Sequence, residues 1–259
     1  MRLIDRWVGI PLCFFASFWP LKKAQADSNS TLATNIPPPD TIVFILIAEI
    51  GALVVAYPAI KETRKQHPKS RICFITAPAG LQTLELMGFE KEDIFLLETS
   101  SIKSLLKGIV NIRSHFKGKR VSAIVLEPFT RFSTLLSAWI GASKRIGCYR
   151  FLNEGVYLGN ILTHRLVYNP HLHMSQTYFA LAKALIEPDS AKPLLKEYIP
   201  SQIKNRLKIN IPEKERQTLM KRLQSECPEN PLKKIILLNA NTSDIVPLRK
   251  WPLENFVEL

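Results

Sequence analysis

Two glutamates each stand just beyond a mainly apolar run, where a carboxylate could take a proton from a hydroxyl group. Glu49 follows the run at 41–47, and Glu127 directly follows the run at 121–126. Gly51, close behind Glu49, would let a ligand approach the backbone because it has no side chain. The carboxylate of a glutamate can act as a general base when it lies within hydrogen-bond reach of the proton that it removes. A solvated loop acid or a charge at a helix N-terminus explains each glutamate equally well.

A pair of cations near the end of the chain could bind a phosphate-bearing ligand. Arg249 and Lys250 precede Trp251-Pro252, where a helix is expected to begin. A cation just ahead of a helix N-terminus suits a diphosphate through its charge and through the backbone dipole. An ordinary basic surface loop is the alternative interpretation.

The elements that would position these residues follow the pattern of βαβ units. Short β-branched runs alternate with longer helical patterns, which predicts an α/β fold around a parallel sheet with helices on both faces. In such sheets ligands bind beyond the carboxyl ends of the strands, so Glu49, Gly51 and Glu127 are expected along one edge. The predicted strands are 41–47, 71–76, 93–97, 121–126 and 145–148.

Helices are predicted between and after these strands. The helix at 52–66 contains Pro58, so it is either kinked there or begins at that residue. No element is predicted between 149 and 173, where the pattern loosens. A strand at 234–238 and a helix opening at Pro252 end the sequence. The other predicted helices are 81–87, 101–116, 132–140, 174–185 and 213–225.

Composition limits the classes of function. Of 259 residues, 35 are Lys or Arg and 22 are Asp or Glu, which gives a net charge of +13 and favours phosphate-bearing partners. The sequence lacks a basic run interleaved with aromatics, so nucleic acid is not the expected partner. Its four cysteines form no CxxC pair and no zinc-ligand spacing, which predicts buried thiols in a reducing compartment and no metal site.

The first forty residues have a different character from the rest. Residues 1–25 hold an apolar run that is shorter than a spanning helix and is flanked by Arg6 and by Lys22-Lys23. We expect this segment to lie in a membrane interface, with its aromatic side chains at the acyl boundary. A secretory signal ending at Ala24-Gln25-Ala26 and a buried terminal helix are the alternatives. Residues 26–40 read as a Pro/Ser-rich linker.

Four stretches together resemble glycosyltransferase family 9, the ADP-heptose:lipopolysaccharide heptosyltransferases. They are "EIGALVVAYPAIKETRKQHP", "VSAIVLEPFTRFSTLLSAWIGASKRIGC", "HMSQTYFALAKAL" and "IILLNANTSDIVPLRKWPLENF". The resemblance implies a GT-B fold of two Rossmann-like domains, with the acceptor bound mainly by the first and ADP-heptose by the second. It further implies inverting, metal-independent transfer of heptose to the lipopolysaccharide core at the cytoplasmic face of the inner membrane, with no cofactor.

The resemblance also assigns expected roles to individual residues. The family's base is typically an Asp just after the first-loop glycine, a position that Ala52 holds here. Because alanine cannot accept a proton, Glu49 is the first expected substitute and Glu127 the second. Arg131 and His173 match positions that face the anionic acceptor, although His173 also reads as a structural imidazole. The donor phosphates are expected to contact Thr242, Ser243, Arg249 and Lys250.

The expected organisation is an N-terminal Rossmann-like domain at 41–228 and an incomplete start of a second domain at 229–259. Family members continue for several more strands and helices, so the chain is expected to be truncated within its donor domain. Ala52 and this truncation keep open a non-catalytic peripheral membrane protein that binds anionic lipid or lipopolysaccharide phosphates. A nucleotide-binding fold for another phosphorylated ligand also remains possible.

Overall fold

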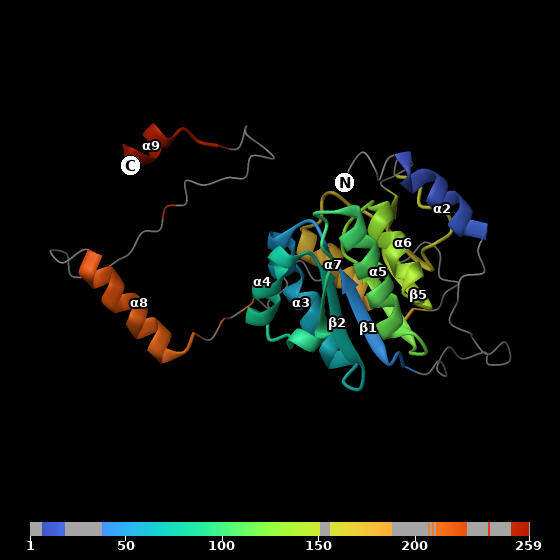
Figure 1. Ribbon diagram of the computed structural model, residues 1–259, viewed down its shortest axis with the longest axis horizontal. Coiled ribbons are helices and arrows are strands. Elements are labelled where there is room, and N and C mark those ends of the chain that lie inside the picture. Colours follow the sequence, from blue (N-terminus) through green and yellow to red (C-terminus); the bar gives the residue numbers. More distant parts are fainter. Residues whose placement is uncertain are drawn as a thin grey trace. The chain divides into compact units, whose positions relative to one another are not determined.

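The computed structural model describes residues 7–18, 38–150, 156–187, 207, 209, 211–226, 238 and 250–258 (Figure 1). The chain divides into two compact units, Met1–Ile209 and Asn210–Leu259. The first unit contains a six-stranded sheet and the helices that cover it. Each unit is described separately below.

The sheet is parallel throughout, with the strand order β3-β2-β1-β4-β5-β6. The chain therefore builds outward from β1 to β3 on one side and then returns to start β4 on the other side of β1. The β1/β4 pair is the switch point of this doubly wound sheet, where such folds place ligands. The strands are β1 (Thr41–Ile45), β2 (Arg71–Thr76), β3 (Ile94–Leu96), β4 (Val121–Val125), β5 (Lys144–Arg150) and β6 (His164–Val167).

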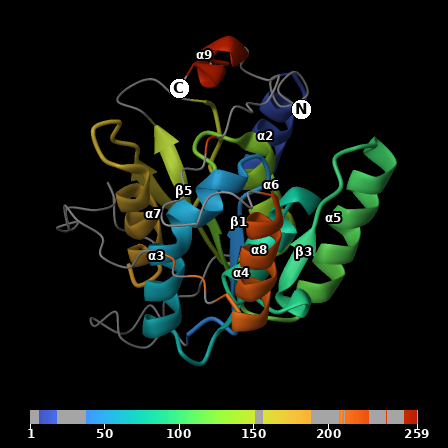
Figure 2. The same cartoon turned by 90° about the vertical axis from the view of Figure 1, so that its left-hand side faces the viewer.

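Helices cover both faces of the sheet, as its continuous apolar strands require (Figure 2). Alternate residues of β1 enter two separate cores because successive side chains of a strand point to opposite faces. Ile42 and Phe44 pack with α3 (Ile50–Gln66), α4 (Leu81–Leu86) and α7 (Met174–Lys183). Val43 and Ile45 pack with α5 (Ile102–Phe116) and α6 (Arg131–Trp139). Two 3₁₀ turns, η1 (Pro78–Gly80) and η2 (Lys91–Asp93), complete the connections.

The expected α/β architecture is confirmed, with two local corrections. The prediction of no element between 149 and 173 was wrong, because β6 forms at the sheet edge there and its pairing with β5 is irregular between Cys148 and Arg150. Its four residues include His164 and Arg165, so β6 lacks the aliphatic run that marked the other strands. The suggestion that a helix begins at Pro58 was also wrong, because α3 starts at Ile50 and continues through this buried proline.

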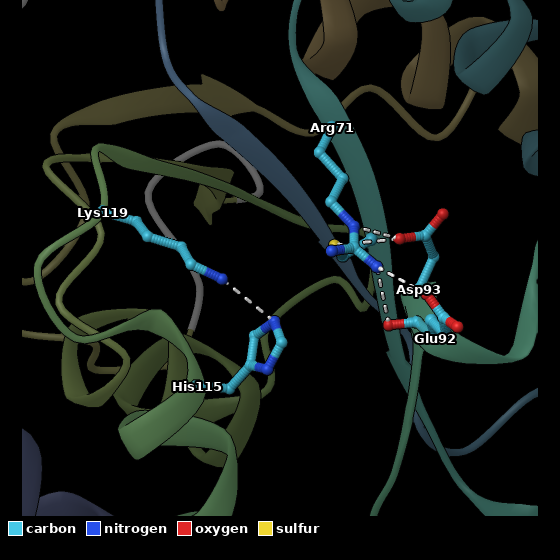
Figure 3. Close-up of polar contacts among 6 residues, drawn as sticks. Arg71, Glu92, Asp93, His115 and Lys119 are labelled. Atoms are coloured by element: carbon cyan, nitrogen blue, oxygen red, sulfur yellow. Dashed lines mark hydrogen bonds and ion pairs between the residues drawn. The ribbon is translucent and has the colours of Figure 1, made fainter.

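Ion pairs and hydrogen bonds close the amino end of the sheet, and Figure 3 shows those of Arg71 and of Lys119. Arg71 at the start of β2 donates from Nε to Asp93 Oδ1, and this hydrogen bond raises the pKa of Arg71. Asp40, just before β1, accepts from Arg120 Nη2 at 2.5 Å and from the Arg120 backbone N–H at 3.0 Å. His115 lies 3.1 Å from Lys119 Nζ. These contacts fix the points where chain segments enter β1, β2 and β4.

A short helix, α2 (Gly9–Phe18), lies beside α6 in the first unit (Figure 1). Among the described residues no helix is long and apolar enough to cross a membrane. The described thiols Cys13, Cys73 and Cys148 are buried, and burial raises the pKa of Cys73 to about 12. Cys227 and nearly all of the expected linker at 26–40 lie outside the described residues.

In the second unit the described elements are two helices. The helix α8 (Glu213–Glu226) has no buried residue and carries an ion pair from Arg222 Nε to Glu226 Oε1 at 3.0 Å. The helix α9 (Leu253–Val257) follows Trp251-Pro252, with Trp251 packed edge-to-face on Phe256. The strand expected at 234–238 lies outside the described residues except for Leu238.

Candidate functional site

The candidate site lies at the carboxyl ends of β1 and β4. These strands pair in parallel register from Thr41 with Val121 to Ile45 with Val125. Because the register is even, the segments that leave the two strands emerge side by side. Glu49 and Glu127 stand in these two segments, and the structure brings them to one edge of the sheet.

Glu127 fastens the two segments together. Its side chain is buried, and Oε1 accepts from the backbone N–H groups of Ile47 at 2.8 Å and Ala48 at 2.6 Å. Its other oxygen, Oε2, accepts from the hydroxyl of Ser133 on α6. Three donors around one carboxylate satisfy two backbone groups that would otherwise lose hydrogen bonds on burial. The geometry therefore gives Glu127 a structural task, whereas its predicted role as a base stays a prediction.

Glu49 stands in a contrasting environment, at the N-cap position of α3. It is exposed, its backbone is extended with φ −128° and ψ 104°, and its side chain makes no capping hydrogen bond. No hydrogen bond or ion pair joins its carboxylate to any residue in the described part of the chain. Its oxygens are therefore open to a ligand. The half-buried methyl group of Ala52 packs against the core one turn further on.

The pKa of a buried tyrosine responds to the charges of both Glu49 and Glu127. Tyr178 on α7 is 1% exposed, and burial raises the pKa of its hydroxyl. The negative charge of Glu49 raises this pKa further, and Glu127 adds a smaller effect in the same direction. The charges of Glu49 and Glu127 therefore both act on Tyr178, although the three residues are far apart in sequence.

The loop after Glu127 contains a strained residue. Phe129 has φ 59°, in the left-handed region that residues other than glycine rarely occupy. Its ring packs edge-to-face on Tyr168, which follows β6, with centroids 5.5 Å apart. Such strain gathers at functional sites, where surrounding contacts hold it in place. No feature of the sequence pointed to this conformation or to the hydrogen bond between Glu127 and Ser133.

Arg131, predicted to face an anionic acceptor, is buried at the first residue of α6. Its Nε donates to the carbonyl of Tyr157 at 3.0 Å. Its side chain also lies under α2, since a Cβ added to Gly9 would be 2.8 Å from Arg131 Cδ. The structure therefore shows Arg131 joining α2 and the loop at 157 to this edge of the sheet. Its role towards an acceptor stays a prediction.

His173, the other predicted acceptor contact, is the N-cap of α7. Its Nδ1 accepts from the backbone N–H of Ser175 at 3.2 Å, and the backbone N–H of His173 donates to Gln176 Oε1 at 3.0 Å. Because Nδ1 acts as an acceptor, the hydrogen of a neutral imidazole lies on Nε2. His173 thus stabilises the helix start and keeps a second nitrogen as a donor on an exposed ring.

The remaining predicted site residues belong to the second unit or lack side chains. Gly51 is exposed, with nothing within 4 Å of an added Cβ. Thr242, Ser243 and Arg249 lie outside the described residues, and Lys250 is exposed ahead of α9. Across the described residues no group of three or more His, Cys, Asp or Glu side chains could hold a metal ion.

Comparison with known proteins points to solved structures. No protein-family model matches the sequence, and no curated protein matches it. The glycosyltransferase of family 9 from Veillonella parvula DSM 2008 is 18% identical, with a TM-score of 0.52, and the match covers 85% of this chain. The ADP-heptose lipopolysaccharide heptosyltransferase II of E. coli is 17% identical, with a TM-score of 0.48, and the match covers 71% of this chain.

This chain spans 58% of the Veillonella structure and 50% of the E. coli structure. At these identities, only the match with a TM-score above 0.5 is informative, and it shows a shared fold. The described sheet and its helices therefore have the α/β architecture of a family 9 glycosyltransferase, in agreement with the Rossmann-like domain of GT-B type expected from the sequence.

Proposed function

We propose that this chain belongs to a glycosyltransferase that moves heptose from ADP-heptose to a lipopolysaccharide core acceptor with inversion. One observation carries the proposal. At the switch point of a sheet with the fold of a family 9 glycosyltransferase, an exposed acid with open oxygens stands beside a buried acid that fixes the loops. The acceptor would bind at this edge.

In the proposed reaction Glu49 takes the proton of the acceptor hydroxyl. The acceptor oxygen then forms a bond to the anomeric carbon of the sugar on the face opposite the diphosphate. The bond from that carbon to the ADP oxygen breaks, and ADP leaves with the electron pair. Positive charge near the diphosphate would stabilise the leaving group, a role that we assign to Arg249 and Lys250.

The remaining groups would prepare the edge for this step. Glu127 would hold the backbone at Ile47 and Ala48, which sets the position of Glu49, the next residue. His173 Nε2 would donate a hydrogen bond to an acceptor oxygen, and Arg131 would act by fixing the edge through the loop at 157. Thr242 and Ser243 would contact the donor phosphates. No metal or cofactor is part of this proposal.

The test is release of ADP from ADP-heptose in the presence of a core oligosaccharide acceptor, followed for the chain and for Glu49→Gln. Removal of a general base is expected to lower kcat by about a hundredfold or more, with little change in KM. Glu98→Gln is a matched control, because Glu98 is an exposed acid at the same edge beyond β3. Undiminished turnover by Glu49→Gln would remove Glu49 as the base.

A non-catalytic binder of the same anionic glycolipid is the second candidate, and Ala52 favours it. This residue holds the position where the resemblance implies the base, and its methyl group packs against the core. Binding of the core oligosaccharide by calorimetry, with no ADP release at any enzyme concentration, would support this candidate against the transferase.

A further inference from the structure

The helix α2 buries its small residues against the domain and exposes its large apolar ones. An amphipathic helix on a globular protein normally buries its large apolar residues. In α2 the buried residues are Gly9 and Cys13, and Ser17, four residues further on, lies on the same helix face. The large aromatic and aliphatic side chains consequently point away from the domain.

The inward face is tied closely to the sheet domain. Ser17 Oγ accepts from the backbone N–H of Asn160 at 2.9 Å. A Cβ at Gly159 would lie 2.0 Å from Ser17 Oγ and 2.7 Å from the carbonyl oxygen of Cys13. Gly159 lets its backbone approach that of Cys13, and Gly9 makes room for the side chain of Arg131. These contacts hold α2 in a specific position beside α6.

The outward face is a continuous apolar surface that we call the aromatic face of α2. Phe14 makes edge contacts with Phe15 and Phe18, with centroids 5.6 and 5.0 Å apart. Phe15 is 68% exposed and Phe18 is 73% exposed, and no charged residue occurs from 7 to 18. The face consists of Trp7, Val8, Ile10, Leu12, Phe14, Phe15 and Phe18.

We propose that the aromatic face of α2 inserts into the interfacial region of an anionic lipid bilayer. Ten residues of helix span only about 15 Å, half of a bilayer core, so the helix would lie along the surface. Cations stand on both sides of the apolar run in the sequence, with Arg6 before it and Lys22 and Lys23 after it. Aromatic side chains at the acyl boundary with cations towards anionic headgroups are the pattern of such interfacial helices.

Docking through this face would also place the candidate site. The inward face of α2 contacts Arg131 at the first residue of α6, which directly follows the loop that carries Glu127 and Phe129. The edge of the sheet beyond β4 would therefore be held close to the lipid surface. A glycolipid acceptor anchored in the same membrane would meet that edge without leaving the bilayer.

Co-sedimentation of the whole chain with vesicles tests the proposal, with no nucleotide or sugar present. The chain is expected to bind vesicles of phosphatidylcholine mixed with phosphatidylglycerol and to bind pure phosphatidylcholine much less. The triple variant Phe14→Ser/Phe15→Ser/Phe18→Ser is expected to bind the vesicles more weakly by a factor of about ten at least, because binding scales with buried apolar area. Phe18→Ser alone, at the most exposed of these positions, should show a smaller loss in the same direction.

A second exposed apolar row provides the matched control. Ile102, Leu106 and Val110 on α5 are 69, 57 and 54% exposed, and their joint change to Ser should leave vesicle binding unaltered. Circular dichroism melts check that all variants fold alike. Equal binding by the triple variant, equal binding to both kinds of vesicle, or an equal loss in the α5 control would overturn the proposal.

Sedimentation velocity without lipid tests for a second copy of the chain as the occupant of this face. Self-association that the triple variant abolishes, in a chain that does not bind vesicles, would assign the face to a dimer and also overturn the proposal. These binding measurements involve no sugar transfer. A negative result would therefore overturn the membrane proposal and leave the proposed reaction untouched.

Discussion

The two ends of the sheet differ in the type of residue that adopts a positive φ angle in their turns. At the amino end, the turns that lead from helices back towards strands place glycines in the left-handed region, with φ 78° at Gly88, 82° at Gly118 and 80° at Gly141. At the carboxyl end, the turn from β4 to α6 places Phe129 there, with φ 59°. Glycine adopts this region without steric cost, whereas phenylalanine does not.

The charges differ in the same way. At the amino end, Asp40 and Asp93 each pair with an arginine. At the carboxyl end, Glu127 is occupied by three donors, while the carboxylate of Glu49 has no hydrogen bond to a described residue. These two acids of the amino end are thus paired, whereas the carboxyl end retains strain and an open acid. Departures of this kind are expected where a protein binds or reacts.

The largest expected effect separates the two acids of the carboxyl end. Glu127→Ala leaves the N–H groups of Ile47 and Ala48 without their acceptor, and should lower the free energy of unfolding by about 3 kcal/mol. Glu49→Ala, at an exposed position, should change it by less than about 0.5 kcal/mol. Urea denaturation measures both. Similar losses for the two variants would show that they are not a structural and an open acid.

A second pair of variants isolates the strain at Phe129. Phe129→Ala removes a ring that packs on Tyr168 and should lower the free energy of unfolding by about 2 kcal/mol. Phe129→Gly removes the same ring but adopts positive φ freely, so it should be about 1 kcal/mol more stable than the alanine variant. An alanine variant as stable as the glycine variant would mean that the backbone at 129 is unstrained.

The amino end offers the converse substitution. Gly118→Ala meets no atom within 4 Å, so its cost should come from the backbone alone. At φ 82° we expect a loss of about 1 kcal/mol in the free energy of unfolding. The same urea measurement applies. A neutral Gly118→Ala would erase the contrast between the two ends.

The smallest effect concerns the Asp40–Arg120 pair and depends on pH. The side-chain hydrogen bond from Arg120 lowers the pKa of Asp40 below its ordinary value of 3.8. Because the folded-state pKa is the lower one, the pair stabilises the protein above pH 3.8 and loses this contribution as pH falls through the folded-state pKa. Asp40→Asn should therefore show a flatter decline of melting temperature in acid, and a parallel decline would contradict it.

Much of the fold could be predicted because its strands are buried on both faces. The runs that became β1 and β4 are almost entirely apolar, and parallel geometry then placed Glu49 and Glu127 at one edge. The sequence could not reveal β6, because an edge strand containing His164 and Arg165 needs no apolar run. It also could not reveal that Glu127 would meet Ser133 or that Phe129 would take positive φ, since tertiary contacts determine both.

The position of Cys13 in α2 makes the alkylation rate of its thiol a measure of how often this helix detaches. This residue is 0% exposed, on the inward face of α2, whereas Cys73 and Cys148 lie inside the two cores of the sheet. A maleimide reagent can reach Cys13 as soon as α2 lifts away, but it reaches the other two only when the domain itself opens. The ratio of their alkylation rates, resolved by peptide mapping, would count how often the helix detaches between unfolding events.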